Sequence, residues 1–304
     1  MANSNGWGDG AANNTIGWGQ GANNTINWGK SHSLSWAGLT DIVGASTPPP
    51  VPVSDTDAQA FLTNAVINDT TQRNAINALV IGLKADLLWT KMLAIYPFVG
   101  GTATTCKFNL KNPLDTNGAH RLDFQGGWTF SNNGVKPNGT TTYANTFLAP
   151  STHFTLGNSS LSHYSRQNTI DNGTPYGTKA GGFNSAISVG FNTSATNIRH
   201  NTNLSYSPLP SPTTTAANLI HSRTDSMTII YGFNQTANAY LNSESALSNH
   251  PIYLGAFNDN NLAINTYYSR EMAFAHIGTG LTSAECTLLY NRIQTFQTTL
   301  GRNV

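Results

Sequence analysis

The sequence predicts a mainly β protein: a jelly-roll sandwich preceded by a short helical connector and an extended Gly/Asn/Trp-rich N-terminal arm, and closed by a C-terminal helix. Only 10% of the 304 residues are charged, against about 25% in an average soluble protein, so neutral polar side chains must provide the solubility. Asn-Gly turn dipeptides recur at 117, 133, 138 and 172, and such turns favour antiparallel sheets. Runs at 185–191 and 226–233 alternate apolar and polar residues, as half-buried strands do.

The first 46 residues contain a near-verbatim repeat rich in Gly and Asn. Its tryptophans Trp7, Trp18 and Trp28, followed by Trp36, match neither the helical nor the strand period. Such a segment cannot build its own core, because Gly loses much backbone entropy on folding. Tryptophan packs a large apolar area, so we interpret residues 1–46 as an arm that docks on a partner or on neighbouring subunits. The alternative is a disordered low-complexity tail.

A proline-rich segment at 47–54 predicts an extended spacer, and residues 55–94 predict a helical connector or neck. Asp55 and Asp57 precede one apolar helical face, formed by Ala58, Phe61, Leu62, Ala65 and Val66. Asp69 or Thr70 caps a second helix, whose apolar stripe is Ile76, Leu79, Val80 and Leu83. A short third element follows at Leu87, Leu88, Trp89 and Met92. These helices are too short and interrupted for a sustained coiled coil.

Residues 95–304 carry the β pattern and are predicted to form the sandwich with its final helix. The proline-containing stretch 206–212 is expected to be a surface loop. Thr282 and Glu285 form a capping box, and Gly301 stands where a left-handed C-terminal residue belongs. The apolar face of this helix consists of Cys286, Leu289, Tyr290, Ile293 and Phe296.

Composition and charge exclude some classes of partner. A net charge of +1 gives no basic surface for nucleic acid, and no apolar run is long enough to span a membrane. The N-terminus lacks the basic and apolar regions of a secretory signal, so we expect synthesis in a cytoplasm without export. For Cys106 and Cys286 two free buried thiols are favoured over a disulfide.

Two groups of segments carry a resemblance to a known family. Residues 96–103, 107–110, 126–129 and 137–140 resemble the opening of concanavalin-like (laminin-G-like) sandwich domains in phage structural proteins. Residues 254–258, 274–278 and 280–285 resemble the end of such domains, and the arm resembles the N-termini of virion fibres and appendages in crAss-like and other tailed phages. The resemblance implies a head or tail fibre subunit, commonly a homotrimer. It transfers no catalytic residue, and the clustered oxygen ligands of a lectin calcium site are not evident.

Catalytic chemistry has little support in the sequence. Glycoside hydrolysis needs a pair of carboxylates, and the chain has only the glutamates Glu244, Glu271 and Glu285. Asp123 and Asp225 each lie near an arginine, Arg121 and Arg223, and structural ion pairs are the favoured interpretation. We therefore expect no enzyme activity and no cofactor.

The histidines never recur at a spacing that would aim two rings at one ion, so we expect scattered residues and no metal site. They are His32, His120, His153, His163, His200, His221, His250 and His276. Carbohydrate binding is more plausible, because loops at the end of a sandwich can offer aromatic platforms. The candidate rings are Tyr164, Tyr176, Tyr206 and Tyr253, each of which is favoured as structural when taken singly.

The sequence therefore predicts a structural phage virion protein, a head (capsid) fibre or appendage subunit on the virion surface. Residues 1–46, with Trp7, Trp18, Trp28 and Trp36, would contact other virion proteins and neighbouring copies, and the sandwich would be displayed for host attachment. The alternatives are a tail-fibre adhesin that recognises host glycans and, less favoured, a polysaccharide-degrading depolymerase.

Overall fold

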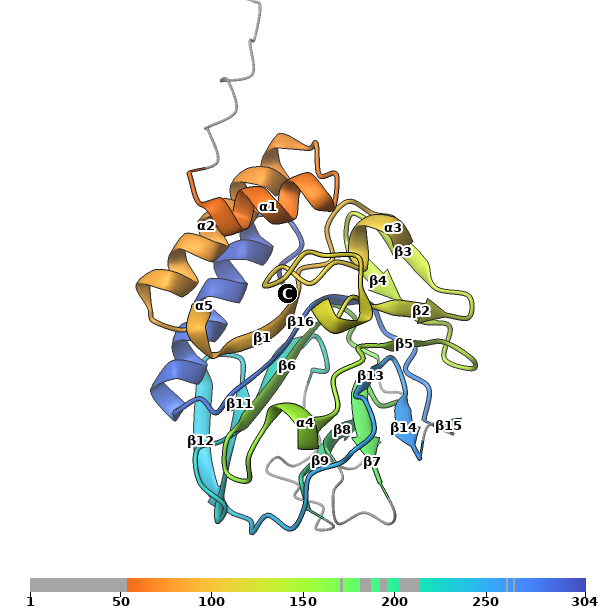
Figure 1. The fold of residues 1–304 in the computed structure, drawn as a ribbon, viewed down its shortest axis with the longest axis vertical. Helices are drawn as coiled ribbons and strands as arrows, with labels where there is room; N and C mark the ends of the chain where they lie inside the picture. The colour runs from red at the N-terminus through yellow and green to blue at the C-terminus, as the bar shows by residue number, and fades with distance from the viewer. Residues whose placement is uncertain are drawn as a thin grey trace, which may run out of the picture. The chain divides into compact units, whose positions relative to one another are not determined.

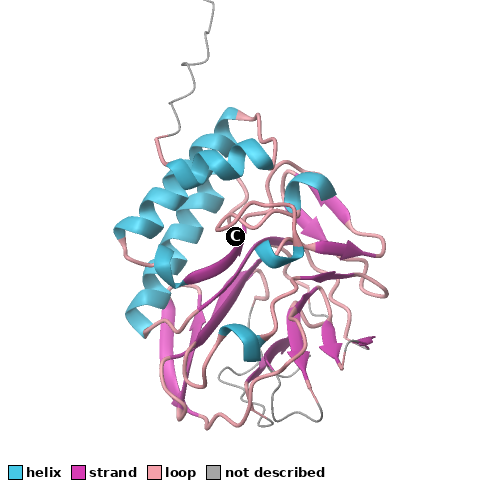
Figure 2. Ribbon diagram, viewed as in Figure 1, coloured by secondary structure: helices cyan, strands magenta, loops and turns pink. Residues whose placement is uncertain are grey.

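The fold consists of two main β-sheets and a layer of helices (Figure 1, Figure 2). A computed structural model describes residues 54–169, 172–180, 187–191, 196–202, 214–260, 262–264 and 266–304. The predicted arm with Trp7, Trp18, Trp28 and Trp36, and the predicted loop 206–212, lie outside these described residues.

The larger sheet has eight strands in the order β12-β11-β10-β6-β16-β4-β3, with β1 also paired to β16. Its strands are β1 Met92–Tyr96, β3 Thr129–Ser131, β4 Gly134–Lys136, β6 Ser159–Ser165, β10 Ala217–Arg223, β11 Thr228–Phe233, β12 Thr236–Leu241 and β16 Met272–Gly278. The second sheet has six strands in the order β15-β14-β7-β13-β5-β2. They are β2 Asp123–Gln125, β5 Tyr143–Asn145, β7 Tyr176–Lys179, β13 Tyr253–Leu254, β14 Phe257–Asp259 and β15 Leu262–Ile264. A hairpin of β8 Ile187–Phe191 and β9 Thr196–His200 forms a third, two-stranded sheet.

Among the described strands the pairings are antiparallel, except that β7 and β14 run parallel. One hydrophobic core lies between the two main sheets, because it draws on both: Leu161 and Leu219 come from the larger sheet, and Ala144, Tyr176 and Leu254 from the smaller. The mainly β sandwich predicted from the sequence is therefore confirmed.

Five helices and two 3-10 turns complete the described chain. They are α1 Thr56–Asn64, α2 Thr70–Ala85, α3 Ala103–Cys106, α4 Pro150–His153 and α5 Ser283–Thr299, with η2 Trp89–Lys91 and η3 Asn117–Ala119. Asp55 caps α1 and Asp69 caps α2 through their carboxylates. Thr282 and Glu285 form the predicted capping box of α5, and Gly301 takes a φ of +65° after it. None of the described helices is both long and apolar enough to cross a membrane.

The connector helices are part of the sandwich unit. A second core, the helix-side core, joins Phe61 of α1, Leu79 of α2 and Ile293 of α5 to Tyr164 and Phe274 of the larger sheet. The sequence boundary placed after residue 94 falls inside β1, which pairs with the central strand β16. The apolar stripes located these helices correctly, but amphipathic spacing does not say which surface covers a stripe.

Val66, predicted on the apolar face of the first helix, and Leu87, predicted in the short third element, are both exposed. Val66 follows the end of α1 and is 64% exposed with a φ of +55°, and Leu87 follows α2 and is 77% exposed with a φ of +60°. Both stand where the chain turns out of a helix in the left-handed conformation, so the helical period no longer applies to them.

The two cysteines are free and buried, as the sequence favoured. Burial raises the pKa of Cys106 to about 11 and that of Cys286 to about 12. Both thiols therefore stay protonated and act as small core residues.

Candidate functional site

The strands β10, β11 and β12 lie at one end of the larger sheet. One face of β11 and β12 carries aromatic side chains. Helix α5 contacts β11 and β12 from the other side of the sheet. Directly paired residues share a face, and here Tyr231 lies opposite Asn238 and Phe233 opposite Thr236. Because side chains alternate along a strand, Tyr240 joins the same face two positions after Asn238.

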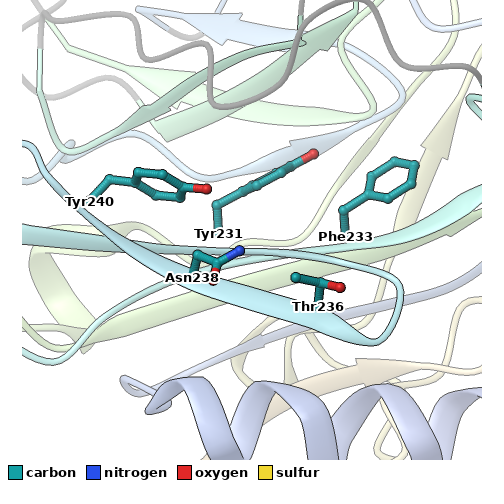
Figure 3. Close-up of a pocket in the computed structure, with 5 residues that line it drawn as sticks. All are labelled: Tyr231, Phe233, Thr236, Asn238 and Tyr240. Carbon is teal, nitrogen blue, oxygen red and sulfur yellow. The ribbon is translucent and has the colours of Figure 1, made fainter.

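These five residues line a hollow of about 190 Å³ on the sheet. Figure 3 shows the rings of Tyr231, Phe233 and Tyr240 on one side of the strands, with Thr236 and Asn238 beside them, while α5 passes on the opposite side. Tyr231 is buried, Phe233 and Tyr240 are half-buried, and Thr236 and Asn238 are exposed. The floor of the hollow is thus aromatic, and an amide and a hydroxyl stand at its open side.

The chemistry of this hollow suits a neutral polar ligand with apolar faces. Aromatic rings offer large flat apolar surfaces, and the Asn238 amide and the Thr236 hydroxyl can both donate and accept hydrogen bonds. The two strands carry no Asp, Glu, Lys, Arg or His. Sugars have this combination of apolar ring faces and neutral hydroxyls.

Beside the hollow, a cluster of buried histidines lies between the sheets. His221 is the direct cross-strand neighbour of Tyr231. The Nδ1 atoms of His221 and His200 are 3.0 Å apart, and His200 Nε2 is 2.7 Å from the hydroxyl of Ser159. The ring of Tyr176 stacks on His221 at a centroid distance of 5.4 Å.

Two further buried histidines lie close by, and the first of them belongs to the same cluster. His163 meets the ring of Tyr176 edge-on at 5.4 Å. On the helix side of the sheet, His276 bonds the hydroxyls of Ser160 at 3.1 Å and Ser162 at 2.5 Å. Burial lowers the pKa of His163 and His200 well below the ordinary value and lowers the pKa of His221 and His276 to about 3.

The expectation of scattered histidines is therefore wrong for this group. The three residues between the sheets come from β6, β9 and β10, so no local spacing could have linked them. Within the part of the chain that the structure describes, no group of three or more His, Cys, Asp or Glu side chains could hold a metal ion. His221 Nε2 and the Tyr176 hydroxyl have no hydrogen-bond partner among the described residues, so this cluster is held by packing as well as by polar contacts.

All three glutamates have protein partners. Glu285 caps α5 and pairs with Lys91 at 2.5 Å, and Glu271 pairs with Arg166 at 2.6 Å. Glu244 accepts hydrogen bonds from the Asn201 amide and the Gly157 backbone N–H, and its burial raises its pKa.

The two predicted aspartate–arginine ion pairs do not form. Arg121 pairs with Asp115 instead, at 3.5 Å, while Asp123 accepts from the Gln125 amide. Arg223 is buried and donates to backbone carbonyls of His200, Thr228 and Asn242. Asp225 accepts from Thr228, whose hydroxyl lowers the pKa of this carboxyl. Asp123 begins β2 with Arg121 before it, and Asp225 comes after Arg223, the last residue of β10, so neither pair lies within one strand, where residues two apart would share a face.

Three of the four tyrosines proposed as glycan platforms are buried. Tyr164 lies under α5 and donates to Gln294 at 3.0 Å. Tyr176 packs in the histidine cluster, and Tyr253 stacks on Tyr143 at 4.6 Å. Tyr206 and the tryptophans Trp7, Trp18, Trp28 and Trp36 lie outside the described residues. Sequence reasoning identified the strand at 226–233 but missed its aromatic face, although the alternation of Thr236, Asn238 and Tyr240 after a turn signals it.

Comparison of the sequence with protein-family models and with curated proteins gives no match. Among solved structures, the chain is similar to domain 4 of AbnA, a GH43 extracellular arabinanase from Geobacillus stearothermophilus, in complex with arabinotriose. That similarity has a TM-score of 0.45 and 15% identity over 66% of this chain and 98% of the domain. The binding domain of botulinum neurotoxin serotype D has a TM-score of 0.46 and 9% identity over 67% of this chain and 52% of the other.

The sialidase of Trypanosoma rangeli, in complex with sialic acid, is a third similar structure. Its TM-score is 0.41 with 11% identity, and the matched region covers 57% of this chain and 30% of the sialidase. Identities this low say nothing of ligand or activity.

Proposed function

We propose that this chain is a structural subunit of a tailed-phage virion, a head-fibre or appendage protein whose β-sandwich binds glycan at the host surface. The observation that carries the binding role is the neutral aromatic hollow of Tyr231, Phe233 and Tyr240 with Thr236 and Asn238. Ligand sites in proteins are mostly apolar hollows with a few placed polar groups, and this hollow has that make-up. The subunit acts by binding and carries out no catalysis.

The arm supplies the virion part of this proposal. The Trp-Gly repeat of residues 1–46 is suited to docking on other virion proteins, because each tryptophan can fill an apolar pocket on a partner. The same arms hold three copies together as a homotrimer, and the sandwich unit projects from the virion surface.

The glycan role is tested by measuring binding of the full chain to an array of bacterial surface polysaccharides. A Tyr240→Ala variant is expected to lose about tenfold or more in affinity, which corresponds to about 1.4 kcal/mol of binding free energy. The loss follows from removing a half-buried ring of the hollow. A Tyr290→Ala variant is the matched control, because that half-buried tyrosine lies on α5 and packs against the helix-side core.

Two results would count against the glycan role. A wild-type chain that binds nothing on the array contradicts it outright. Equal losses in the Tyr240 and Tyr290 variants would place any glycan elsewhere. Release of reducing ends from a bound polysaccharide would instead indicate the depolymerase alternative.

The anchoring role is tested by deleting residues 1–46. The shortened chain keeps the described helices and sheets, which begin after residue 54, and is expected to fold but no longer to associate with virions. Sedimentation with purified particles measures this association. Binding to particles that survives the deletion would overturn the assignment of the arm.

A further inference from the structure

The edge strand β12 is unlike the other free edges of the two main sheets. Their hydrogen-bonded orders end at β12, β3, β2 and β15. The last three are only three residues long, and β2 carries Asp123. Strand β1, which joins β16 off the main order, has its outer side covered, because Leu110 N–H bonds Ile95 O and the Asn109 side chain bonds Ile95 N–H. Short or charged edges resist pairing with a second chain.

Strand β12 has none of these protections. It is six residues long and consists of Thr, Ala, Asn, Ala, Tyr and Leu, without charge or proline. It lies at the margin of the sheet in Figure 1, and among the described strands it pairs with β11 alone. A long neutral edge of this kind is a template for another β-strand.

The hydrogen-bond pattern shows which backbone groups are available. Asn242 N–H bonds Met227 O, so these directly opposite residues form a hydrogen-bonded pair. In an antiparallel ladder such pairs alternate, so Tyr240, Asn238 and Thr236 also bond to β11. The N–H and C=O groups of Ala237, Ala239 and Leu241 therefore point outward, away from β11.

The side chains on these outward-bonding residues are small or apolar. Ala237 packs against the helix-side core, and by alternation Ala239 and Leu241 share that face. Leu241 is 85% exposed, more than any other large apolar side chain among the described residues. An apolar side chain this exposed on an unpaired edge is the kind of residue that a pairing strand covers.

We propose that β12 pairs antiparallel with β12 of a second copy of this chain, about a twofold axis at Ala239. In this register Ala239 faces its own equivalent, and Leu241 lies opposite Ala237 of the second copy. Each of the three outward residues in each copy has one N–H and one C=O, so the contact holds six hydrogen bonds. Leu241 becomes covered by Ala237 and by the neighbouring α5 of the other copy.

A second copy fits this edge because the edge is complementary to itself. No like charges meet when two uncharged strands pair, and the small alanines at the centre let the backbones approach without a clash. On the opposite face, Asn238 of one copy comes opposite Tyr240 of the other. The two sheets thus join into one, with two aromatic hollows on a common face.

The proposal stands apart from the proposed function, since it concerns the sheet edge and requires no glycan. It also differs from the homotrimer held by the arms, because a twofold contact joins whatever unit the arms form to a second such unit. Where the three β12 edges of one trimer pair with the three of a second trimer, breaking the contact halves the mass, as it does for a dimer of single chains.

The test uses charges at Ala239 in the full chain. An Ala239→Lys variant places two ammonium groups opposite each other across the axis, and like charges directly opposite destabilise strand pairing. Its mass by light scattering is expected to fall twofold relative to wild type, and an Ala239→Glu variant is expected to behave in the same way. Mixing the two variants is expected to restore the wild-type mass, because only a residue on the axis meets its own equivalent.

A Leu114→Lys variant is the control, since Leu114 is also an exposed apolar residue but lies outside β12. It is expected to leave the mass unchanged, and circular dichroism checks that every variant is folded. Wild-type mass in the folded Ala239→Lys protein would overturn the proposal. So would a mixture of the two charged variants that keeps the reduced mass, because pairing in this register requires its recovery.

Discussion

Replacing Arg302 with methionine is expected to lower the free energy of unfolding by about 3 kcal/mol or more. Arg302 is buried just beyond the end of α5. Its guanidinium donates to the backbone carbonyls of Pro97 at 2.6 Å, Phe98 at 2.8 Å and Ala273 at 2.9 Å. It also reaches Asn132 O at 3.3 Å and the side chain of Gln297 at 2.6 Å.

The sign of this effect depends on what the substitution leaves behind. Burial lowers the pKa of Arg302 to about 9, so the buried cation itself is costly, and removing an ion pair together with its partner can be neutral. Here the acceptors are backbone carbonyls from separate segments, and they stay in place when the arginine is gone. Each carbonyl left buried without a donor costs about 1–3 kcal/mol, which outweighs the relief of removing the charge.

Urea denaturation followed by tryptophan fluorescence measures this loss. Arg292→Met is the matched control: Arg292 bonds Asp86 through two contacts of 2.7 and 2.9 Å, but its side chain is 38% exposed. Exposed pairs of this kind contribute about 1 kcal/mol or less. A loss of unfolding free energy for Arg302→Met no larger than that of the control would show that Arg302 does not hold helix α5 against the larger sheet.

The elements of the fold followed from local signals, and these were strong. The carboxylates of Asp55 and Asp69 and the capping box of Thr282 mark three helix starts correctly, because capping depends only on residues within one turn. The dipeptide Asn133-Gly134 likewise marks the hairpin between β3 and β4.

The candidate site could not be predicted in the same way, because it depends on strand order. Tyr231 and Asn238 meet through a hairpin that the sequence indicates, but His221 and His200 meet across two sheets. Arg302 is a sharper case, since its partners at 97, 98, 132 and 273 come from three distant segments. Such contacts follow from topology, which local periodicity leaves open.

Acidification from pH 7 to pH 5 is expected to destabilise the protein strongly, because its buried histidines must remain neutral in the folded state. The pKa values of His221 and His276 fall to about 3 through burial, and those of His163 and His200 are also lowered well below the ordinary value. In the unfolded chain each ring titrates near pH 6.5. Between those values the unfolded state binds more protons, so stability falls as the pH falls.

The magnitude is large compared with ordinary domain stability. A group that is neutral when folded and titrates near 6.5 when unfolded contributes a loss of about 2 kcal/mol between pH 7 and pH 5. Four such histidines together contribute about 8 kcal/mol, which lies within the 5–15 kcal/mol typical of a whole domain. The carboxyl of Glu244 acts in the opposite direction, because its pKa is raised, but one such group cannot offset four histidines.

Free energies of unfolding from urea titrations at pH 7, 6 and 5 measure this dependence. His276→Gln keeps a polar side chain beside Ser160 and Ser162 and removes one titrating ring, so the loss between pH 7 and pH 5 is expected to shrink by about 2 kcal/mol. A His250→Gln control, at a position that is only half-buried, is expected to retain nearly the full loss. The outcome that contradicts this account is equal stability at pH 7 and pH 5 in the wild-type chain, because that result requires the buried rings to accept protons as readily as exposed ones.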